Sequence, residues 1–353
     1  MNQTSPTKIK KSYWPEGSIL LLVVLVVVFF LLDLFIGSYH ISLSNILKAL
    51  FAPGQVDSQL VTIVRQFRLP KALTALLAGA ALSVAGLQMQ TVFRNPLAGP
   101  YVLGISSGAS LGVALLVLGA GNLFAAGAFS VLGAWSVAGA AWIGAAVILL
   151  LILAVSARVK DIMTILILGI LFSSATSAIV NIMQYFSNES MLKSFVVWTM
   201  GSLGSVTNAQ LHVLLPGVLL GLFLAIISAK LLDAFLLGED YARSMGMNVQ
   251  LARILIFIST CILAGSITAF CGPIGFIGIA VPHIVRMALK TARHQRLIPG
   301  SILLGSATML FSDIVSQLPG SESTLPINSV TALLGIPVVI WIILRNKTVG
   351  ALS

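Results

Sequence analysis

Few residues of this chain have the types and spacing that catalysis or metal binding would need. The sequence contains no G-x-x-x-x-G-K-[ST] loop for nucleotide phosphates, and no H-E-x-x-H or G-x-S-x-G motif in a hydrolase setting. Gly104-Ile-Ser-Ser-Gly108 has glycines like those of a phosphate loop, but it lacks a lysine and lies in an apolar stretch, which favours helix packing. Cys261 and Cys271 stand in apolar sequence without CxxC spacing, which predicts reduced thiols in the core. His283 has Arg286 on the same helical face but no second ligand nearby, so we expect a structural histidine, no metal site and no catalytic residue.

Acidic residues that could carry a proton or an ion across a membrane are equally few. Asp33 and Asp313 each lie near the end of an apolar stretch, where we expect both to reach the membrane interface. A proton- or sodium-coupled transporter more often has an acid in the middle of a span, and no other stretch supplies one. This favours an energy source on another polypeptide.

The composition indicates that these residues are positioned by elements that lie in lipid. Hydrophobic residues make up 58% of the 353 residues and charged residues only 8%, and the mean hydropathy is +1.05. Soluble domains carry about 25% charged residues. The net charge of +10 does not indicate a nucleic-acid partner, because the basic residues form short clusters between apolar stretches, as in membrane proteins.

Ten apolar stretches approach the roughly 20 residues that a membrane span requires. The first follows Lys8, Lys10 and Lys11 without a small-residue cleavage site, so we interpret it as a retained transmembrane helix and not as a signal peptide. Two stretches are short enough that hydropathy alone leaves nine or ten spans open. The stretches lie near 19–36, 72–89, 102–118, 134–155, 162–183, 211–227, 254–270, 274–287, 298–311 and 329–344.

The distribution of charge favours ten spans. The basic residues before the first stretch, and Arg345 and Lys347 after the last, place both termini in the cytoplasm, which requires an even number of crossings. With ten spans, fifteen Lys and Arg residues lie inside and five outside, as the positive-inside rule expects. We therefore predict an all-α integral protein of the cytoplasmic (inner) membrane, with one ten-helix domain over residues 18–345 between cytoplasmic tails at 1–17 and 346–353.

Two connections stand out in this arrangement. Arg65, Arg68 and Lys71 form a basic cluster on the outer side, where positive charge is disfavoured, and this suggests a use for them there. The cytoplasmic segment near 230–253 contains a short helix that acidic residues begin and Gly246 ends. Such a helix could be a lid, a surface helix or a docking element.

The motifs along most of the chain resemble those of the FecCD permeases, the transmembrane subunits of binding-protein-dependent ABC importers for iron-siderophores, haem and vitamin B12. Arg68-Leu-Pro-Lys71 is similar to the R-L-P-R of this family at the start of the second helix. The remaining matches are Ala78-Gly79 to Gln90, Arg94-Asn95-Pro96-Leu97-Ala98-Gly99-Pro100, Leu103-Gly104 to Ala109, Trp198 to Leu203, Leu237-Gly238 to Gly246, the block Cys271 to Arg286 with Gly275, Gly278, Pro282, His283 and Arg286, and Leu325 to Pro337.

The resemblance implies a ten-helix bundle like that of the vitamin B12 permease, with a second permease subunit, most simply as a homodimer. It also implies two partner ATPase subunits that bind the ATP and Mg²⁺, no cofactor on this chain, and an extracytoplasmic substrate-binding protein. The inner helix then becomes the ATPase-coupling helix, with Gly238, Glu239, Asp240, Ala242, Arg243, Ser244 and Gly246.

The resemblance assigns docking of the binding protein to Arg68 and Lys71, to which we add Arg65 for its charge. Two departures bear on this contact. Lys71 replaces an arginine and lacks its planar fork for a carboxylate. Gln317 stands where the vitamin B12 permease has a further docking arginine, which implies a smaller or displaced charge contact.

We expect the cargo to be a ferric siderophore, with haem and vitamin B12 as alternatives within the family. An ion-coupled secondary transporter or a channel is the alternative from another class. Methionines on or after the fifth helix could line the path, although packing by flexible side chains is the simpler interpretation; they are Met163, Met183, Met191 and Met200.

Overall fold

The computed structural model describes residues 16–37, 41–119, 128–159, 161–317 and 324–350, and these ranges contain helices and no strand. Two short 3-10 segments, η1 (Pro53–Gln55) and η3 (Pro100–Leu103), and two π-helical segments, η2 (Ile63–Arg68) and η4 (Leu115–Gly119), adjoin the helices. The helices are α1 (Glu16–Phe35), α2 (Leu43–Phe51), α3 (Ser58–Thr62), α4 (Leu69–Val92), α5 (Ile105–Ala114), α7 (Ala128–Arg158), α8 (Ile162–Tyr185), α9 (Glu189–Thr199), α10 (Asn208–Ile227), α11 (Ala229–Leu237), α12 (Glu239–Ser244), α13 (Val249–Cys271), α14 (Ile277–Leu289), α15 (His294–Ser316) and α16 (Ile327–Gly350).

Side-chain caps explain where several long helices begin. The carboxylate of Asp161 accepts hydrogen bonds from the first turn of α8. Thr207 and Gln210 form a capping box at the start of α10, and Asn248 accepts from the Leu251 N–H at the start of α13. Each cap satisfies backbone N–H groups that a helix leaves without partners in its first turn.

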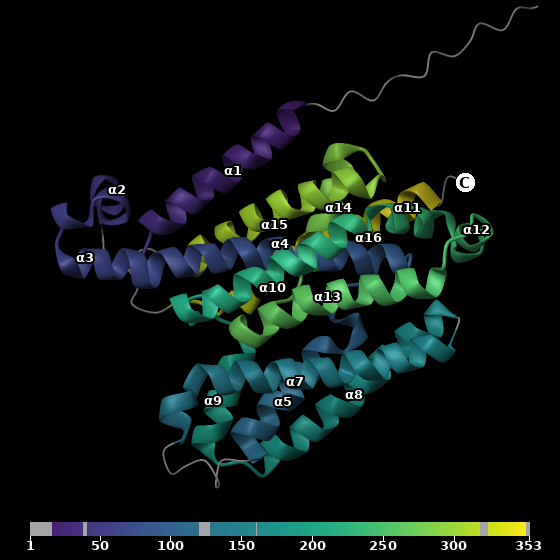
Figure 1. The fold of residues 1–353 in the computed structure, drawn as a ribbon, viewed down its shortest axis with the longest axis horizontal. Coiled ribbons are helices and arrows are strands. Elements are labelled where there is room, and N and C mark those ends of the chain that lie inside the picture. Colours follow the sequence, from purple (N-terminus) through teal and green to yellow (C-terminus); the bar gives the residue numbers. More distant parts are fainter. Residues whose placement is uncertain (1–15, 38–40, 120–127, 160, 318–323, 351–353) are drawn as a thin grey trace, which may run out of the picture.

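The central helix of the bundle is α4, which α13, α14 and α15 surround (Figure 1). In the apolar part of the continuous helical stretch Ser58–Val92, 89% of the residues are buried, against 11% in α1, which packs on α15 at the periphery. Helices α5, α7, α8 and α9 form a second group, which packs on the first through α13 and α7. The helix α4 is therefore enclosed by protein, whereas α1 leaves most of its apolar surface exposed.

Glycine allows the helices around α4 to approach closely. A Cβ atom at Gly86 would collide with the carbonyl oxygen of Gly278 on α14, and one at Gly79 would collide with that of Gly305 on α15. Small residues at such crossings allow tight packing in the absence of a hydrophobic driving force between helices. The apolar surroundings of Gly104 suggested a position within a helix, but the structure places it just before α5. Its φ of 78° is a left-handed conformation that favours glycine.

Among the residues that the structure describes, seven helical stretches have the length and composition to cross a membrane: Ser18–Phe35, Ser58–Val92, Trp135–Arg158, Ile162–Tyr185, Asn208–Ile227, Val249–Cys271 and His294–Ser316. Three shorter apolar helices, Ile105–Gly119, Ile277–Leu289 and Ile327–Trp341, occupy the positions of the other predicted spans. The ninth predicted span, short by hydropathy, belongs to a helix of 23 residues. The all-helical membrane architecture is thus confirmed, whereas ten crossings and two cytoplasmic termini stay a prediction.

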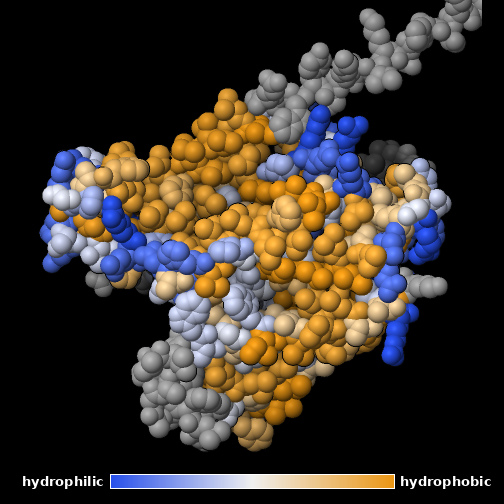
Figure 2. Space-filling view, viewed as in Figure 1, coloured by the Kyte–Doolittle hydropathy of each residue, from blue (hydrophilic) through white to orange (hydrophobic). Residues whose placement is uncertain are grey.

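Apolar side chains cover the middle of the visible face, and hydrophilic ones gather towards its ends (Figure 2). The end with α2 and α3 lies opposite the end with α12 (Figure 1). We name the first the outer end and the second the inner end, in keeping with the predicted orientation. Both sites that the sequence singles out lie at these ends.

Candidate functional site

The short helix α12 lies at the inner end and is bracketed by two glycines, as predicted. Gly238 precedes it with a φ of 107° and Gly246 follows it with a φ of 83°, both in the left-handed region that favours glycine. Ala242 is buried, and its carbonyl oxygen accepts a hydrogen bond from the Met247 N–H. One face of α12 is thereby fixed against the body of the chain.

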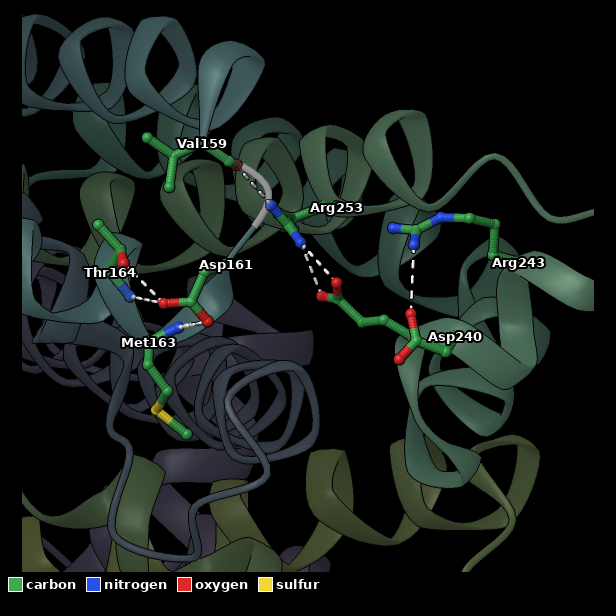
Figure 3. Close-up of polar contacts among 8 residues, drawn as sticks. Val159, Asp161, Met163, Thr164, Asp240, Arg243 and Arg253 are labelled. Atoms are coloured by element: carbon green, nitrogen blue, oxygen red, sulfur yellow. Dashed lines mark hydrogen bonds and ion pairs between the residues drawn. The ribbon is translucent and has the colours of Figure 1, made fainter.

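A buried ion pair joins α12 to the long helices (Figure 3). Nη2 of Arg253 lies 2.7 Å from Oε1 and 2.8 Å from Oε2 of Glu239, and Nη1 donates to the Val159 carbonyl oxygen at 3.3 Å. The Arg253 side chain is only 3% exposed. One guanidinium therefore connects α12, the first turns of α13 and the end of α7. The sequence predicted only that Arg253 lies on the cytoplasmic side. Its pairing with Glu239 was not predicted, because the two residues are 14 positions apart in the chain.

The other face of α12 is open to a partner. Asp240 accepts from Nη1 of Arg243 at 3.2 Å, and both side chains of this pair are exposed. Tyr241 and Met245 are also exposed, at 52% and 66%. Ser244 is exposed as well, and its hydroxyl donates to the Tyr241 carbonyl oxygen. The predicted coupling residues thus divide into Glu239 and Ala242, which hold the helix, and a charged and aromatic exposed face.

Asp161 forms the connection between α7 and α8 beside this network (Figure 3). Hydrogen bonds from the Thr164 side chain and N–H and from the Met163 N–H hold the pKa of the Asp161 carboxyl below its usual range, and the charge of Arg253 adds to the effect. The ionised carboxylate therefore caps α8 at neutral pH.

Four polar side chains from three helices meet at the outer end. Nζ of Lys71 lies 2.8 Å from Oδ2 of Asp313, and Nε2 of Gln317 donates to Asp33 at 2.9 Å and to Asp313 at 3.2 Å. Asp33 and Asp313 are buried, at 4% and 2% exposure, so the expectation that both reach the membrane interface is wrong. They are buried because α1 packs on α15 and α4, and Lys71 and Gln317 satisfy the carboxylate oxygens.

The other predicted docking cations also contact the chain itself. Arg68 donates to the carbonyl oxygens of Leu34 and Phe35 at the end of α1, at 2.7 and 3.0 Å. Arg65 donates to those of Ala49 and Leu50 near the end of α2, at 2.9 and 2.7 Å. Both arginines thus satisfy carbonyl groups that a helix leaves unpaired in its last turn.

An open cavity of about 660 Å³ lies above this cluster at the outer end. Arg68, Lys71 and Asp313 form its polar wall, and Met200 and Phe67 contribute apolar surface. A partner that enters this cavity could reach Arg68 and Lys71, two of the three predicted docking cations.

The family-motif residues mostly hold helices together. Nη1 of Arg286 donates to Gln90 at 2.6 Å, and the Gln90 amide donates to the Ile279 carbonyl oxygen at 3.0 Å, next to the Gly278 crossing. The Gly275 N–H donates to the Asn328 side chain at 2.9 Å. Asn95 accepts from the Leu97 N–H in the turn after α4, where Pro96 is exposed; Pro282 and His283 lie within α14.

The structure does not bring the predicted path methionines together. Met163 is in the first turn of α8 and Met183 in its last, about 30 Å apart along the helix axis. Met183 packs partly against the core, whereas Met163 is exposed at the inner end. Met200 lines the outer cavity. A role of these methionines in a translocation path stays a prediction.

Buried polar groups elsewhere serve packing. Cys261 and Cys271 are free and buried, as predicted. His294 contacts Asp233 at 2.7 Å and Thr91 at 2.8 Å, an arrangement that superficially resembles a catalytic triad. Thr91 is buried and donates to the Leu87 carbonyl oxygen, so the three side chains tie α4, α11 and α15. Within the described residues, no three His, Cys, Asp or Glu side chains are grouped to hold a metal.

Comparison with known proteins shows which family and which solved structure this chain resembles. The model of the FecCD transport family matches residues 24–345. A solved structure described as an inward-facing conformation of a putative metal-chelate type ABC transporter is 29% identical, with a TM-score of 0.80 over 93% of this chain and 99% of that chain.

Curated relatives cover most of the chain. The hemin transport system permease protein of Yersinia pestis is 35% identical over 79% of this chain and 82% of its own length. The vitamin B12 import system permease protein of Salmonella typhi is 36% identical over 84% of this chain and 88% of its own length. An uncharacterized ABC transporter permease protein of Bacillus subtilis is 33% identical over 89% of both chains.

Proposed function

This chain belongs to the FecCD transport family of ABC importer permeases, and from this premise we propose that it carries a ferric siderophore across the cytoplasmic membrane. The family match over residues 24–345 is the observation that supports transport by an ABC importer, and the ferric siderophore is our proposal for the cargo within this family. The chain acts with a second copy of itself, two ATPase subunits that bind ATP and Mg²⁺, and an extracytoplasmic binding protein.

On the inner side, α12 docks on an ATPase subunit. Its exposed face, with Asp240, Tyr241 and Met245, makes the contact, while Glu239 and Arg253 transmit a displacement of α12 to the ends of α7 and α13. The three elements move together because the buried pair is costly to separate. ATP binding thereby shifts the permease pair between outward-open and inward-open packings.

On the outer side, the loaded binding protein docks at the cavity that Arg68 and Lys71 line. Lys71 leaves Asp313 and pairs instead with an acidic side chain of that protein. Electrostatic attraction of this kind accelerates the encounter and fixes its register.

Haem and vitamin B12 are the alternative cargoes, and the names of two relatives favour them. Uptake by proteoliposomes that contain the permease, its ATPase and its binding protein separates the three. We expect ATP-dependent uptake of a ferric siderophore, with hemin and cobalamin as matched competitors. Uptake of hemin or cobalamin without uptake of the ferric siderophore would identify that compound as the cargo instead. Uptake that follows an ion gradient without ATP would contradict the importer itself and favour a secondary transporter or a channel.

A further inference from the structure

The seam between α7 and α13 contains two cavities, one polar and one apolar. The polar cavity, of about 370 Å³, lies at the inner end between the last turn of α7 and the first turn of α13. The apolar cavity, of about 270 Å³, lies deeper along the same two helices. Neither takes part in the coupling or docking described above, apart from the two arginines of the α12 network that the polar cavity shares.

The polar cavity has the chemistry of a phosphate site. Its lining includes Arg158, Arg243 and Arg253 and no carboxylate, although Arg253 pairs with Glu239 and Arg243 with Asp240 from outside the lining. Ser156 also lines it, is 2% exposed, and its hydroxyl has no hydrogen-bond partner among the described residues. The first turn of α13, which begins at Val249, borders it; Asn248 accepts from the Leu251 N–H, and the positive end of the helix dipole there favours an anion. Arg158 makes no ion pair with any described residue, so its charge is available to a ligand.

The apolar cavity continues the same stripe of α7. Trp142, Ala146 and Leu149 line it, and Ser156 follows at helical spacing on the same face. From Trp142 to Ser156 the axis rises about 21 Å. One leaflet of hydrocarbon is about 15 Å thick and the headgroup layer adds about 5–7 Å. Trp142 lies at the outer end of this apolar cavity, which we call the groove. The ring centroids of Trp142 and Phe270 are 5.3 Å apart, and the two rings meet edge to face.

We propose that the α7–α13 seam binds one anionic phospholipid of the inner leaflet, with its phosphate among the three arginines and an acyl chain in the groove at Ala146 and Gly265. The alignment of the two cavities favours a lipid over an acidic side chain of a partner, which would need the polar cavity only. Basic pockets between transmembrane helices at the cytoplasmic side suit such headgroups.

The full chain in nanodiscs of equal dioleoyl phosphatidylglycerol and dioleoyl phosphatidylcholine tests the proposal. Native mass spectrometry of the released protein measures the retained phosphatidylglycerol. Arg158→Gln should lower retention about fivefold. Lys230→Gln removes a cation from an exposed cytoplasmic position outside the cavity and should leave retention unchanged.

A second pair of variants tests the groove. Ala146 is exposed and lines the groove, so Ala146→Phe should fill it and also lower retention, whereas Val147→Phe, on the exposed neighbour outside the lining, should not. Equal retention by Arg158→Gln and Lys230→Gln would overturn the proposal. Displacement of the lipid by inorganic phosphate without an effect of Ala146→Phe would also overturn it and indicate a free-anion site. Unchanged lipid with weaker ATPase association in Arg158→Gln would assign the cavity to that partner.

Discussion

The two ends of the molecule use buried charge in opposite ways. At the outer end, the three predicted docking cations already contact the chain: Arg65 and Arg68 bind helix ends and Lys71 binds Asp313. At the inner end, the pair between Glu239 and Arg253 helps to hold α12, while Asp240 and Arg243 on the exposed face of α12 contact each other and remain exposed. An outer partner must therefore compete with internal contacts, whereas an inner partner meets a surface that is already formed.

The composition of the two clusters explains why they should respond differently to substitution. The inner pair has one carboxylate for one guanidinium, and Nη2 of Arg253 contacts both carboxylate oxygens of Glu239, which offsets part of the desolvation of the two charges. The outer cluster has two buried carboxylates, Asp33 and Asp313, for one ammonium group. Loss of an acid should be tolerated better at the outer end, since a second acid remains beside Lys71.

The largest effect is expected from Glu239→Leu, which leaves the charge of Arg253 buried without its carboxylate. We expect a loss of about 3 kcal/mol in the free energy of unfolding in detergent. Arg253→Met in the same chain should recover most of this loss, because the double variant buries no unpaired charge. Denaturant unfolding of the two single variants and the double variant measures the cycle. Additive losses would show that the pair does not hold α12.

An intermediate effect is expected from Asp313→Asn, which releases Lys71 from its ion pair. Stability should fall by about 1–2 kcal/mol, less than at the inner end, because Asp33 and Gln317 remain. If docking requires Lys71 to leave Asp313, the affinity for the binding protein should rise about fivefold. Titration of the binding protein against the permease in nanodiscs measures it.

Lys71→Met is the matched control at the outer end, since it removes the cation and should lower the same affinity. Reversal of Lys71 to an acid is a poorer test, because it would add a third carboxylate to the buried pair. A lower affinity in Asp313→Asn would contradict the exchange of partners.

The same contrast separates what could be predicted from the sequence and what could not. The bounds of α12 followed from Gly238 and Gly246, because helix ends depend on local backbone conformation. The apolar stretches followed from composition, since lipid requires it. Both are properties of contiguous residues.

Contacts between helices could not be predicted in this way. Asp33, Lys71 and Asp313 lie on three helices far apart in the sequence, so their mutual burial depends on packing that one sequence does not reveal. Arg253 was likewise missed as a partner of Glu239. A charge at the end of an apolar stretch has the same local appearance whether it faces water or a partner helix, which is why both acids were expected at the interface.

The smallest effect on stability is expected from Asp240→Asn, and it tests whether the inner face is already formed. Asp240 is fully exposed and pairs with Arg243 at 3.2 Å within one helix turn, so its loss should not measurably shift unfolding. If α12 docks through this face, association with the ATPase subunits should weaken and the difference should shrink at high salt, because exposed charges are screened. Analytical size exclusion at two salt concentrations measures both. A loss of stability comparable to that of Glu239→Leu would mean that the inner face also depends on internal contacts, and the two ends would then differ in degree and not in kind.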